Sequence, residues 1–373
     1  MTTKLRVGVI MGGRSGEHEV SIISGQSLIK ALDKNKYEII PIGITKSGKW
    51  ITDNVINTLK AGSDNDNKEL TEKILTPQPH THQLMALNEQ KMTNLGLDVV
   101  FPVLHGTYGE DGSIQGLFEL ANLPYVGAGV LGSAVGMDKV IMKKIFAWFD
   151  LPQVSYADIL KTDWLEDQDK KIKLIEEVLA YPVFIKPANL GSSVGINKAK
   201  NKNELIKAID IAFDYDRKVI IEEGLEDIRE IECAVLGNDQ PKASLPGEVK
   251  PSDEFYSYQD KYIDGKTQFE IPAKLDNKLV NEIQEMSVKA FQALDLSGMA
   301  RVDFFLTKDN ELILNEVNTI PGFTKISMYP KLWGVSGLKY EKLLDKLINF
   351  ALEKHKQKNE LKTSYKPKSD WYK

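Results

Sequence analysis

The sequence predicts an α/β protein with several domains, the first of which is Rossmann-like. Apolar residues 6–11 have the pattern of a buried strand that stops at Gly12 and Gly13. Residues 20–32 then place apolar side chains at helical spacing, and residues 38–44 form a second strand pattern. This order of strand, glycine turn, helix and strand is typical of a βαβ unit. With 373 residues, the chain is also longer than one hydrophobic core usually holds.

The same periodicities extend over the rest of the chain. They indicate further strands and helices at residues 99–104, 113–121, 124–127, 139–149, 183–186, 219–222, 275–294 and 338–356. Residues 62–96 are polar and irregular, which indicates a surface excursion. We therefore expect three domains and a flexible tail, at residues 1–136, 137–227, 228–357 and 358–373.

The composition excludes some classes of partner. Lys and Arg total 48 against 53 Asp and Glu, so the net charge of -5 provides no field for binding nucleic acid. The single cysteine, Cys233, lies in an apolar strand pattern and is expected to be a packed core thiol. The first apolar run is too short for a signal peptide, and no segment is long enough to span a bilayer. We therefore expect a cytoplasmic protein with no membrane partner.

Two glycine motifs resemble nucleotide-binding fingerprints, but each departs from its pattern. Residues 43–49 fit a P-loop, but Trp50 stands where a Ser or Thr hydroxyl should reach magnesium, so a plain turn between two strands explains the motif better. Residues 12–16 resemble a dinucleotide fingerprint, but Met11 stands at the first glycine position and residues 40–42 offer no acidic side chain. A nicotinamide-dependent oxidoreductase is therefore disfavoured.

The strongest chemical signal is a β-hairpin with Asp309-Asn310 as its tight turn. Folding about that turn pairs Asp303 with Glu316 and Arg301 with Asn318, so these four side chains share one face. The other face is apolar and contains Val302, Phe304, Ile313 and Val317. Opposed carboxylates repel each other. A salt bridge from Arg301 could relieve this repulsion, but the oxygen set suits Mg²⁺ and favours a metal site.

Three other segments carry candidate functional groups. Residues 186–195 place Lys186 and several Gly and Ser residues at a strand end, where they could fold over phosphates or form a plain linker. Residues 220–225 resemble a hinge strand whose backbone could read an adenine edge. Residues 105–112 place His105 and two acids at a strand-to-helix turn. Acids there also favour the helix macrodipole, so the structural and functional interpretations both stay open.

The order of these segments resembles that of a known family. The matching motifs lie at residues 12–21, 105–112, 186–195, 256–262 and 315–322, with Arg301 before the last. Together they are similar to the D-alanine–D-alanine ligases of the ATP-grasp superfamily, over nearly the whole chain except residues 62–96 and the tail. The resemblance implies a three-domain ATP-grasp fold with a Rossmann-like, preATP-grasp N-terminal domain. ATP would lie between the other two domains.

The resemblance also implies which residues bind ATP and metal. The ATP-binding set is Lys139, Lys186, Ser193, Glu222, Glu223, Leu225, Glu230 and Lys261. The lysines should reach the phosphates, and the stretch from Glu222 to Glu230 should surround adenine and ribose. Relatives often have Lys in place of Glu223, which weakens only a side-chain role because the backbone is expected to do the reading. Two Mg²⁺ ions, or Mn²⁺, should bind Asp303, Glu316 and Asn318, in agreement with the hairpin.

The implied reaction makes D-alanyl-D-alanine for peptidoglycan precursors, with release of ADP and phosphate. The γ-phosphoryl group moves to the first D-alanine, and the amine of the second attacks the acyl phosphate. Glu17 would anchor the first ammonium, and His105 would help to shape its pocket. Arg301 and the Gly322 backbone N–H would hold the oxyanion, while Ser327 would bind the second carboxylate.

A lid at residues 253–266 is implied as well, closed by a trio of Glu17, Ser192 and Tyr262 that keeps water from the acyl phosphate. Relatives that make D-alanyl-D-lactate generally have Phe in place of Tyr262, so a D-alanine–D-lactate ligase is the alternative product class. A non-catalytic ATP-grasp nucleotide-binding protein is the alternative from another class, and the intact charged set argues against it. D-alanine and ATP are the expected ligands, and a homodimer is expected from the family.

Overall fold

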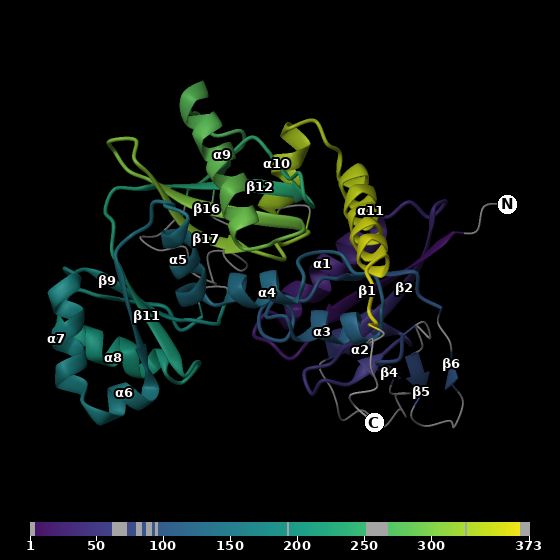
Figure 1. The fold of residues 1–373 in the computed structure, drawn as a ribbon, viewed down its shortest axis with the longest axis horizontal. Coiled ribbons are helices and arrows are strands. Elements are labelled where there is room, and N and C mark those ends of the chain that lie inside the picture. Colours follow the sequence, from purple (N-terminus) through teal and green to yellow (C-terminus); the bar gives the residue numbers. More distant parts are fainter. Residues whose placement is uncertain are drawn as a thin grey trace.

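The structure is a computed structural model, and it describes residues 4–61, 73–79, 84–86, 92–93, 96–191, 194–250, 268–324 and 327–365. Three β-sheets of seven, four and six strands follow one another along these residues. Figure 1 shows the four-stranded sheet and its helices lying apart from the N-terminal sheet. None of the helices in the described part of the chain combines the length and apolar character needed to cross a lipid bilayer.

The N-terminal sheet confirms the predicted βαβ opening. Strand β1 (Leu5–Gly12) pairs in parallel with β2 (Tyr37–Ile44) and with β7 (Val99–Pro102), and helix α1 (His18–Ala31) connects the first two. Gly25 lets α1 lie close to β1, because a Cβ there would be 2.9 Å from the Met11 side chain. The other helices of this part are α2 (Val55–Ala61), α3 (Ser113–Leu120) and α4 (Val130–Met137).

The segment expected to be an irregular excursion extends the N-terminal sheet instead. Short antiparallel strands pair in sequence beyond β2, and these are β3 (Trp50–Ile51), β4 (Lys73–Leu75), β5 (Leu84–Ala86) and β6 (Met92–Thr93). The strands are only two or three residues long, which is too short for a periodicity to emerge from the sequence. The strand expected at residues 124–127 is a single bridge between Tyr125 and Val100.

The central sheet is antiparallel, in the order β10-β9-β11-β8. Its strands are β8 (Tyr156–Leu160), β9 (Val183–Pro187), β10 (Asn197–Ala199) and β11 (Lys218–Glu223). Helices α6 (Lys161–Glu166), α7 (Gln168–Val178) and α8 (Lys202–Ala212) accompany it (Figure 1). Helix α5 (Lys139–Trp148) contacts the sheet through Val140, which packs with Ala188 and Ile220.

The C-terminal sheet has the order β15-β14-β12-β16-β17, with β13 paired to β12. Its strands are β12 (Arg229–Gly237), β13 (Lys242–Ala243), β14 (Gly247–Lys250), β15 (Gln268–Glu270), β16 (Gly298–Leu306) and β17 (Leu312–Asn318). The helices of this part are α9 (Asn277–Ala293), α10 (Met328–Val335) and α11 (Tyr340–Asn359). Helix α11 thus extends past residue 357, where we expected a tail to begin.

The hydrophobic cores do not follow the sheets one to one. A single core contains Met11 and Phe101 of the N-terminal sheet, Leu236 of the C-terminal sheet, and Leu347 of α11. The ring of Phe101 meets that of Phe323 edge-on at 5.6 Å within this core. The central sheet and its three helices have a separate core. The N-terminal and C-terminal parts are therefore packed together through shared apolar contacts, and the central part has its own.

The predicted hairpin is formed by β16 and β17, and its register near the polar residues is confirmed. Arg301 pairs with Asn318, and Asp303 pairs with Glu316. The predicted two-residue turn is wrong, because Thr307 and Glu311 close a loop of three residues in which Asn310 has φ 62°. A register shift directly after Asp303 compensates for the extra turn residue. The same register shift changes which residue of β17 belongs to the apolar face. Leu314 is fully buried, whereas Ile313, which we expected on that face, is not.

Candidate active site

The turn after β1 brings a buried carboxylate beside the end of β7. Gly12 has φ 94°, and a Cβ there would lie 2.2 Å from a backbone oxygen of β2, so the turn requires glycine. Ser15 Oγ donates to the His105 carbonyl at 2.7 Å. Glu17 is only 8% exposed, and a Cβ on Gly106 would lie 2.7 Å from its Oε2. The predicted residues Glu17 and His105 therefore belong to one site.

His105 and Glu110 connect this turn to the loop after β17. His105 Nδ1 lies 3.1 Å from the Ile320 carbonyl oxygen, and Nε2 lies 3.3 Å from Ser24 Oγ. Because a carbonyl can only accept, Nδ1 carries the proton and Nε2 accepts from the serine. Burial lowers the pKa of His105, which favours this neutral form. Glu110 accepts hydrogen bonds from Gly106 N at 2.8 Å and Ile320 N at 2.9 Å.

Glu110 is a residue that the sequence reasoning did not assign to the site. Burial, and then the nearby charge of Glu17, raise its pKa to about 8. The macrodipole interpretation of the two acids fits only Asp111, whose Oδ1 accepts from Ser113 N at the start of α3. Both acids looked alike in the sequence because the backbone partner of Glu110 at Ile320 is 210 residues away.

A row of acidic side chains crosses the C-terminal sheet. Glu232 on β12 pairs with Asp303 on β16, which pairs in turn with Glu316 on β17. Arg301 compensates this charge: it donates to Asp303 through Nε at 2.7 Å and Nη2 at 2.6 Å, and its Nε lies 3.1 Å from Glu232 Oε2. Asn318 Nδ2 donates to Asp303 Oδ2 at 2.9 Å. The salt bridge considered in the sequence analysis is therefore present, and Glu232 is an additional member that the sequence did not reveal.

A cluster of lysines faces this row from α5 and the central sheet. Lys139 Nζ donates to the Leu190 carbonyl at 2.8 Å and lies 3.7 Å from Glu316 Oε2. Lys186 Nζ is paired with Glu222 Oε2, and Lys143 Nζ lies 3.0 Å from Glu222 Oε1.

These contacts give Glu222 a surrounding different from the one expected. Burial alone would raise the pKa of Glu222, but the ammonium groups of Lys143 and Lys186 lower it to about 2. Its side chain, which we expected near adenine and ribose, thus lies on two lysines and is 4% exposed. Lys143 was missed, although its spacing of four residues from Lys139 on one helix was the signal that could have found it.

The segment after β11 connects the central and C-terminal sheets. Glu223 N donates to the Ser155 carbonyl at 3.0 Å, and its carboxylate accepts weakly from Ser155 N at 3.4 Å. Leu225 and Glu230 are half-buried, and Glu230 lies on β12. The charge of Glu230 acts together with those of Glu222 and Glu316, and they raise the pKa of Lys186 against the opposing effect of burial. Glu230 therefore lies close enough to interact electrostatically with Lys186.

Gly322 and Ser327 are neighbours at the start of α10. A Cβ on Gly322 would lie 2.8 Å from Ser327 Oγ, which favours glycine at this position. Ser327 Oγ accepts from Thr324 N at 3.0 Å and lies 2.7 Å from Thr324 Oγ1. The two predicted substrate-binding positions therefore share one loop, and their roles stay predictions.

Four predicted site residues lie outside the described residues, namely Ser192, Ser193, Lys261 and Tyr262. The expected lid at residues 253–266 lies outside them as well. Within the part of the chain that is described, no group of three or more His, Cys, Asp or Glu side chains is arranged to hold a metal ion. The set expected from the sequence has two carboxylates and one amide, so its role stays a prediction.

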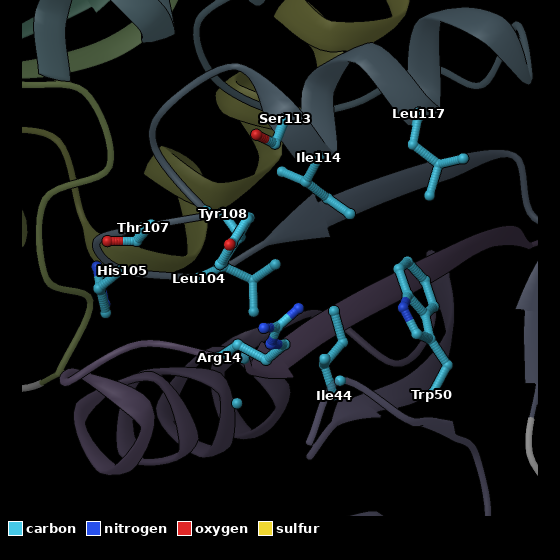
Figure 2. Close-up of a pocket in the computed structure, with 14 residues that line it drawn as sticks. Arg14, Ile44, Trp50, Leu104, His105, Thr107, Tyr108, Ser113, Ile114 and Leu117 are labelled. Carbon is cyan, nitrogen blue, oxygen red and sulfur yellow. The ribbon is translucent and has the colours of Figure 1, made fainter. Parts of the chain in front are cut away.

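A largely apolar cavity of about 240 Å³ lies beside the turn after β1, with Gly12, Gly13 and His105 in its lining. Figure 2 shows Ile44, Trp50, Leu104 and Leu117 around it, with His105 at its edge. The Arg14 guanidinium lies 5.0 Å from the centre of the Tyr108 ring. No motif in the sequence indicated this cavity. Because its walls are apolar, the charged cluster on α5 and the central sheet is the better place for phosphate groups.

Comparison with known proteins finds relatives that match most of the chain. The family model described as D-ala D-ala ligase N-terminus matches residues 6–128, and that described as D-ala D-ala ligase C-terminus matches residues 145–349. The chain is 48% identical to the D-alanine–D-alanine ligase of Natranaerobius thermophilus, over 97% of this chain and 99% of that protein.

Solved structures give the same result. The D-alanine–D-alanine ligase of Coxiella burnetii has a TM-score of 0.80 at 37% identity, covering 95% of this chain and 96% of that one. The VanG D-Ala:D-Ser ligase of Enterococcus faecalis has a TM-score of 0.83 at 38% identity, covering 94% of this chain and all of that one. The ATP-grasp fold and the ligase class expected from the sequence are confirmed. The chain belongs to the D-alanine–D-alanine ligase family.

Proposed function

We propose that this ligase joins two D-alanines through an acyl phosphate, at a site where the three parts of the chain meet. The observation that carries the proposal is the approach of the glycine-serine loop to the amino-acid side. A Cβ on Gly191 would lie 3.0 Å from Glu17 Oε2. The loop that follows Lys186 therefore reaches the carboxylate expected to hold the first ammonium. This contact supports a reaction between a phosphate and an amino acid.

The residues can then be assigned to the steps of the reaction. A carboxylate oxygen of the first D-alanine attacks the γ-phosphorus of ATP, and ADP leaves. The neutral amine of the second D-alanine attacks the acyl carbon, and phosphate leaves from the tetrahedral intermediate and takes up the proton that the nitrogen gives off. Glu17 holds the first ammonium beside the neutral His105, and Ser327 binds the second carboxylate. Arg301 and the Gly322 N–H stabilise the oxyanion.

The nucleotide is assigned to the lysine cluster and the segment after β11. Lys139, Lys186 and Lys261 hold the phosphates, and Ser193 contributes a donor from the loop. The backbone of Glu223 and Leu225 reads adenine, and Glu230 binds ribose. The side chain of Glu222 orients Lys186 through the ion pair described above. Ser192, Tyr262 and Glu17 close the lid over the bound substrates.

The acidic row suits divalent cations. Asp303, Glu316 and Asn318 supply the oxygen ligands that Mg²⁺ prefers, and Mn²⁺ accepts the same donors. The row carries three carboxylates against the single Arg301, with Lys139 nearby, so it retains negative charge for two metal ions bound with the phosphates. When bound, the metals would neutralise charge on the transferring phosphoryl group.

We further propose three domains at residues 1–136, 137–227 and 228–357, a tail at 358–373, a cytoplasmic location and a homodimer. The domain proposal is supported by the three sheets, each of which lies within one range. The homodimer is supported by exposed apolar side chains on the adjacent helices α3 and α4, where Leu120 and Leu131 are 64% and 59% exposed. Light scattering of the purified protein tests it, and a monomeric mass contradicts it.

The activity is tested by phosphate release from ATP with Mg²⁺ and D-alanine at neutral pH, with dipeptide identified by mass spectrometry. D-alanine alone should suffice. Phosphate release that does not depend on D-alanine would support the non-catalytic or unrelated alternatives. Chelation of Mg²⁺ should abolish release, and its replacement by Mn²⁺ should restore it.

The product assignment needs a separate test with mixed substrates. D-lactate and D-serine are each added to D-alanine, since one structural relative is named a D-Ala:D-Ser ligase. D-alanyl-D-alanine should remain the main product of the protein with its natural sequence. Tyr262→Phe should shift the preference toward D-lactate, and an unchanged product ratio would count against the proposed role of Tyr262 in the lid.

A further inference from the structure

Lys143 is a buried lysine to which neither the mechanism above nor the family resemblance gives a role. It is 1% exposed and is the one charged residue among the largest fully buried side chains in the described part of the chain. Its carbonyl accepts from Gln153 Nε2 at 2.9 Å, and its Nζ lies 5.9 Å from the centre of the Tyr156 ring. A buried ammonium costs several kcal/mol unless it is compensated. Among the described residues, its ion-pair partner is Glu222, whose Oε1 lies 3.0 Å from the Lys143 Nζ.

Glu222 is shared between two ammonium groups. Its Oε1 faces Lys143 and its Oε2 faces Lys186, and its side chain is 4% exposed. If Lys143 were absent, the whole carboxylate charge would act on Lys186 alone. Lys186 would then form a neutral buried pair and would attract an incoming anion less strongly.

The charges around this pair are closely balanced. Three lysines, at positions 139, 143 and 186, stand among the three acids Glu222, Glu230 and Glu316. Removing the charge of one lysine would leave the cluster net negative, at a place where a triphosphate must bind. In a buried site, such a change is only weakly screened by salt.

We propose that Lys143 is a positioning residue that neutralises Glu222, so that the charge of Lys186 remains available to the nucleotide phosphates. The inference rests on the proposed function, because it takes Lys186 to be a phosphate ligand. Lys143 itself does not touch the nucleotide, since Glu222 lies between it and Lys186 in the chain of ion pairs. Its effect is therefore specific to the phosphates and independent of the adenosine moiety.

The experiment measures dissociation constants for Mg-AMPPNP and for adenosine by calorimetry on the full-length protein. Lys143→Met should weaken Mg-AMPPNP binding roughly tenfold or more, because Glu222 would then neutralise Lys186, which would attract the phosphates less strongly. Adenosine binding should change by less than about twofold, which is within ordinary scatter for an untouched site. Lys143→Gln keeps a hydrogen-bond donor without the charge, so it should lose as much affinity as Lys143→Met.

A double variant decides between a charge effect and a packing effect. Lys143→Met combined with Glu222→Gln restores the charge balance and should recover most of the Mg-AMPPNP affinity, although two native side chains are missing. A packing role predicts instead that the two losses add. Lys144→Met is the matched control, because Lys144 lies on the same helix, is 54% exposed in its side chain and pairs with Asp158 at 3.4 Å.

Several outcomes would overturn the proposal. These are equal losses for adenosine and Mg-AMPPNP, rescue of the affinity by Lys143→Gln, or a double variant that is weaker than either single variant. Circular dichroism identifies variants that fail to fold, and Lys143→Gln keeps the test available if Lys143→Met does so. Failure of the proposed function has a different signature, namely a natural protein that binds Mg-AMPPNP but releases no phosphate with D-alanine.

Discussion

The proposed amino-acid side of the site adjoins a core that the N-terminal and C-terminal parts share, whereas the proposed nucleotide side lies at the edge of a separate core. On the first side, His105 and Glu110 bond directly to the backbone of Ile320, and Phe101 packs on Phe323 below them. On the second side, the central sheet contacts α5 through Val140, and the Lys139–Glu316 ion pair joins α5 to the C-terminal sheet.

This difference indicates a division of labour. Apolar packing over a shared core fixes the positions of groups to within small displacements, because interiors are close-packed. Ion pairs and a single helix contact permit the central part to adjust around a nucleotide. We therefore expect the D-alanine pocket to be largely formed before binding, and the phosphate-binding side to move.

The largest effect is expected from Arg301→Met. Arg301, with a side chain that is 19% exposed, lies between Asp303 and Glu232, whose side chains are 14% and 8% exposed. Removing the guanidinium leaves adjacent carboxylates uncompensated, which should lower the free energy of unfolding by ~3–5 kcal/mol. Chemical denaturation measures this.

The matched control for Arg301 is Lys308→Met, which removes an ion pair with Asp227 whose side chains are 70% and 65% exposed. An exposed pair of this kind contributes ~0–1 kcal/mol. If the two variants were equally stable, the acidic row around Arg301 would contribute no more to the free energy of unfolding than an exposed ion pair does.

Two core substitutions test whether the cores are independent. Leu347→Ala in α11 and Ile209→Ala in α8 remove fully buried side chains from the shared and central cores, respectively. Each should cost ~2–5 kcal/mol. Hydrogen exchange should then accelerate in β1 and β12 for Leu347→Ala, and in β9 and β11 for Ile209→Ala. Equal acceleration of all strands by Ile209→Ala would show one cooperative unit instead of two.

The pH dependence of stability tests the amino-acid side alone. The pKa of Glu110 is raised from 4.5 to about 8 by burial and by Glu17, so the folded protein holds this proton more tightly than the unfolded chain. Stability from this group is therefore complete below its unfolded pKa and is lost as pH rises toward about 8. The slope is at most ~1.4 kcal/mol per pH unit.

Glu110→Gln should remove this slope, as measured by denaturation at several pH values between about 4.5 and 8. The stability of Glu110→Gln relative to that of the natural protein should therefore be greatest at the alkaline end of the range. If stability depended on pH in the same way in both proteins, Glu110 would be ionised throughout this range. Its carboxyl group would then not be in a buried environment.

The sequence predicted the parts of the fold that have long periodic patterns. The βαβ opening and the pairing of Asp303 with Glu316 are confirmed. The register was right although the turn was wrong, because the bulge after Asp303 cancels the extra turn residue. Propensity patterns do not specify bulges, which depend on how the strand must bend in the sheet. The short strands within residues 62–96 were missed for want of length.

For the site, sequence reasoning alone found the hairpin and left the other motifs open. Glu110 and Glu232 were missed because their roles come from contacts between distant segments, at Ile320 and Arg301. Lys143 was missed because a lysine on an amphipathic helix is ordinarily exposed. Local sequence patterns do not predict contacts between segments that are far apart in the chain. The family resemblance depends only on the order of the motifs and requires no knowledge of contacts.

The smallest effect is expected at Cys233, which provides a natural probe of the C-terminal sheet. Its thiol is fully buried, and burial raises its pKa to about 11, so alkylation requires local opening of the sheet. Labelling by iodoacetamide, followed by mass spectrometry, should be very slow. Nucleotide should leave the rate nearly unchanged, because the thiol is part of the C-terminal sheet and not of the central sheet that is expected to adjust. Much faster labelling of Cys233 with nucleotide bound would mean that binding loosens the C-terminal sheet itself. That result would contradict the proposed division between a fixed and an adjustable side.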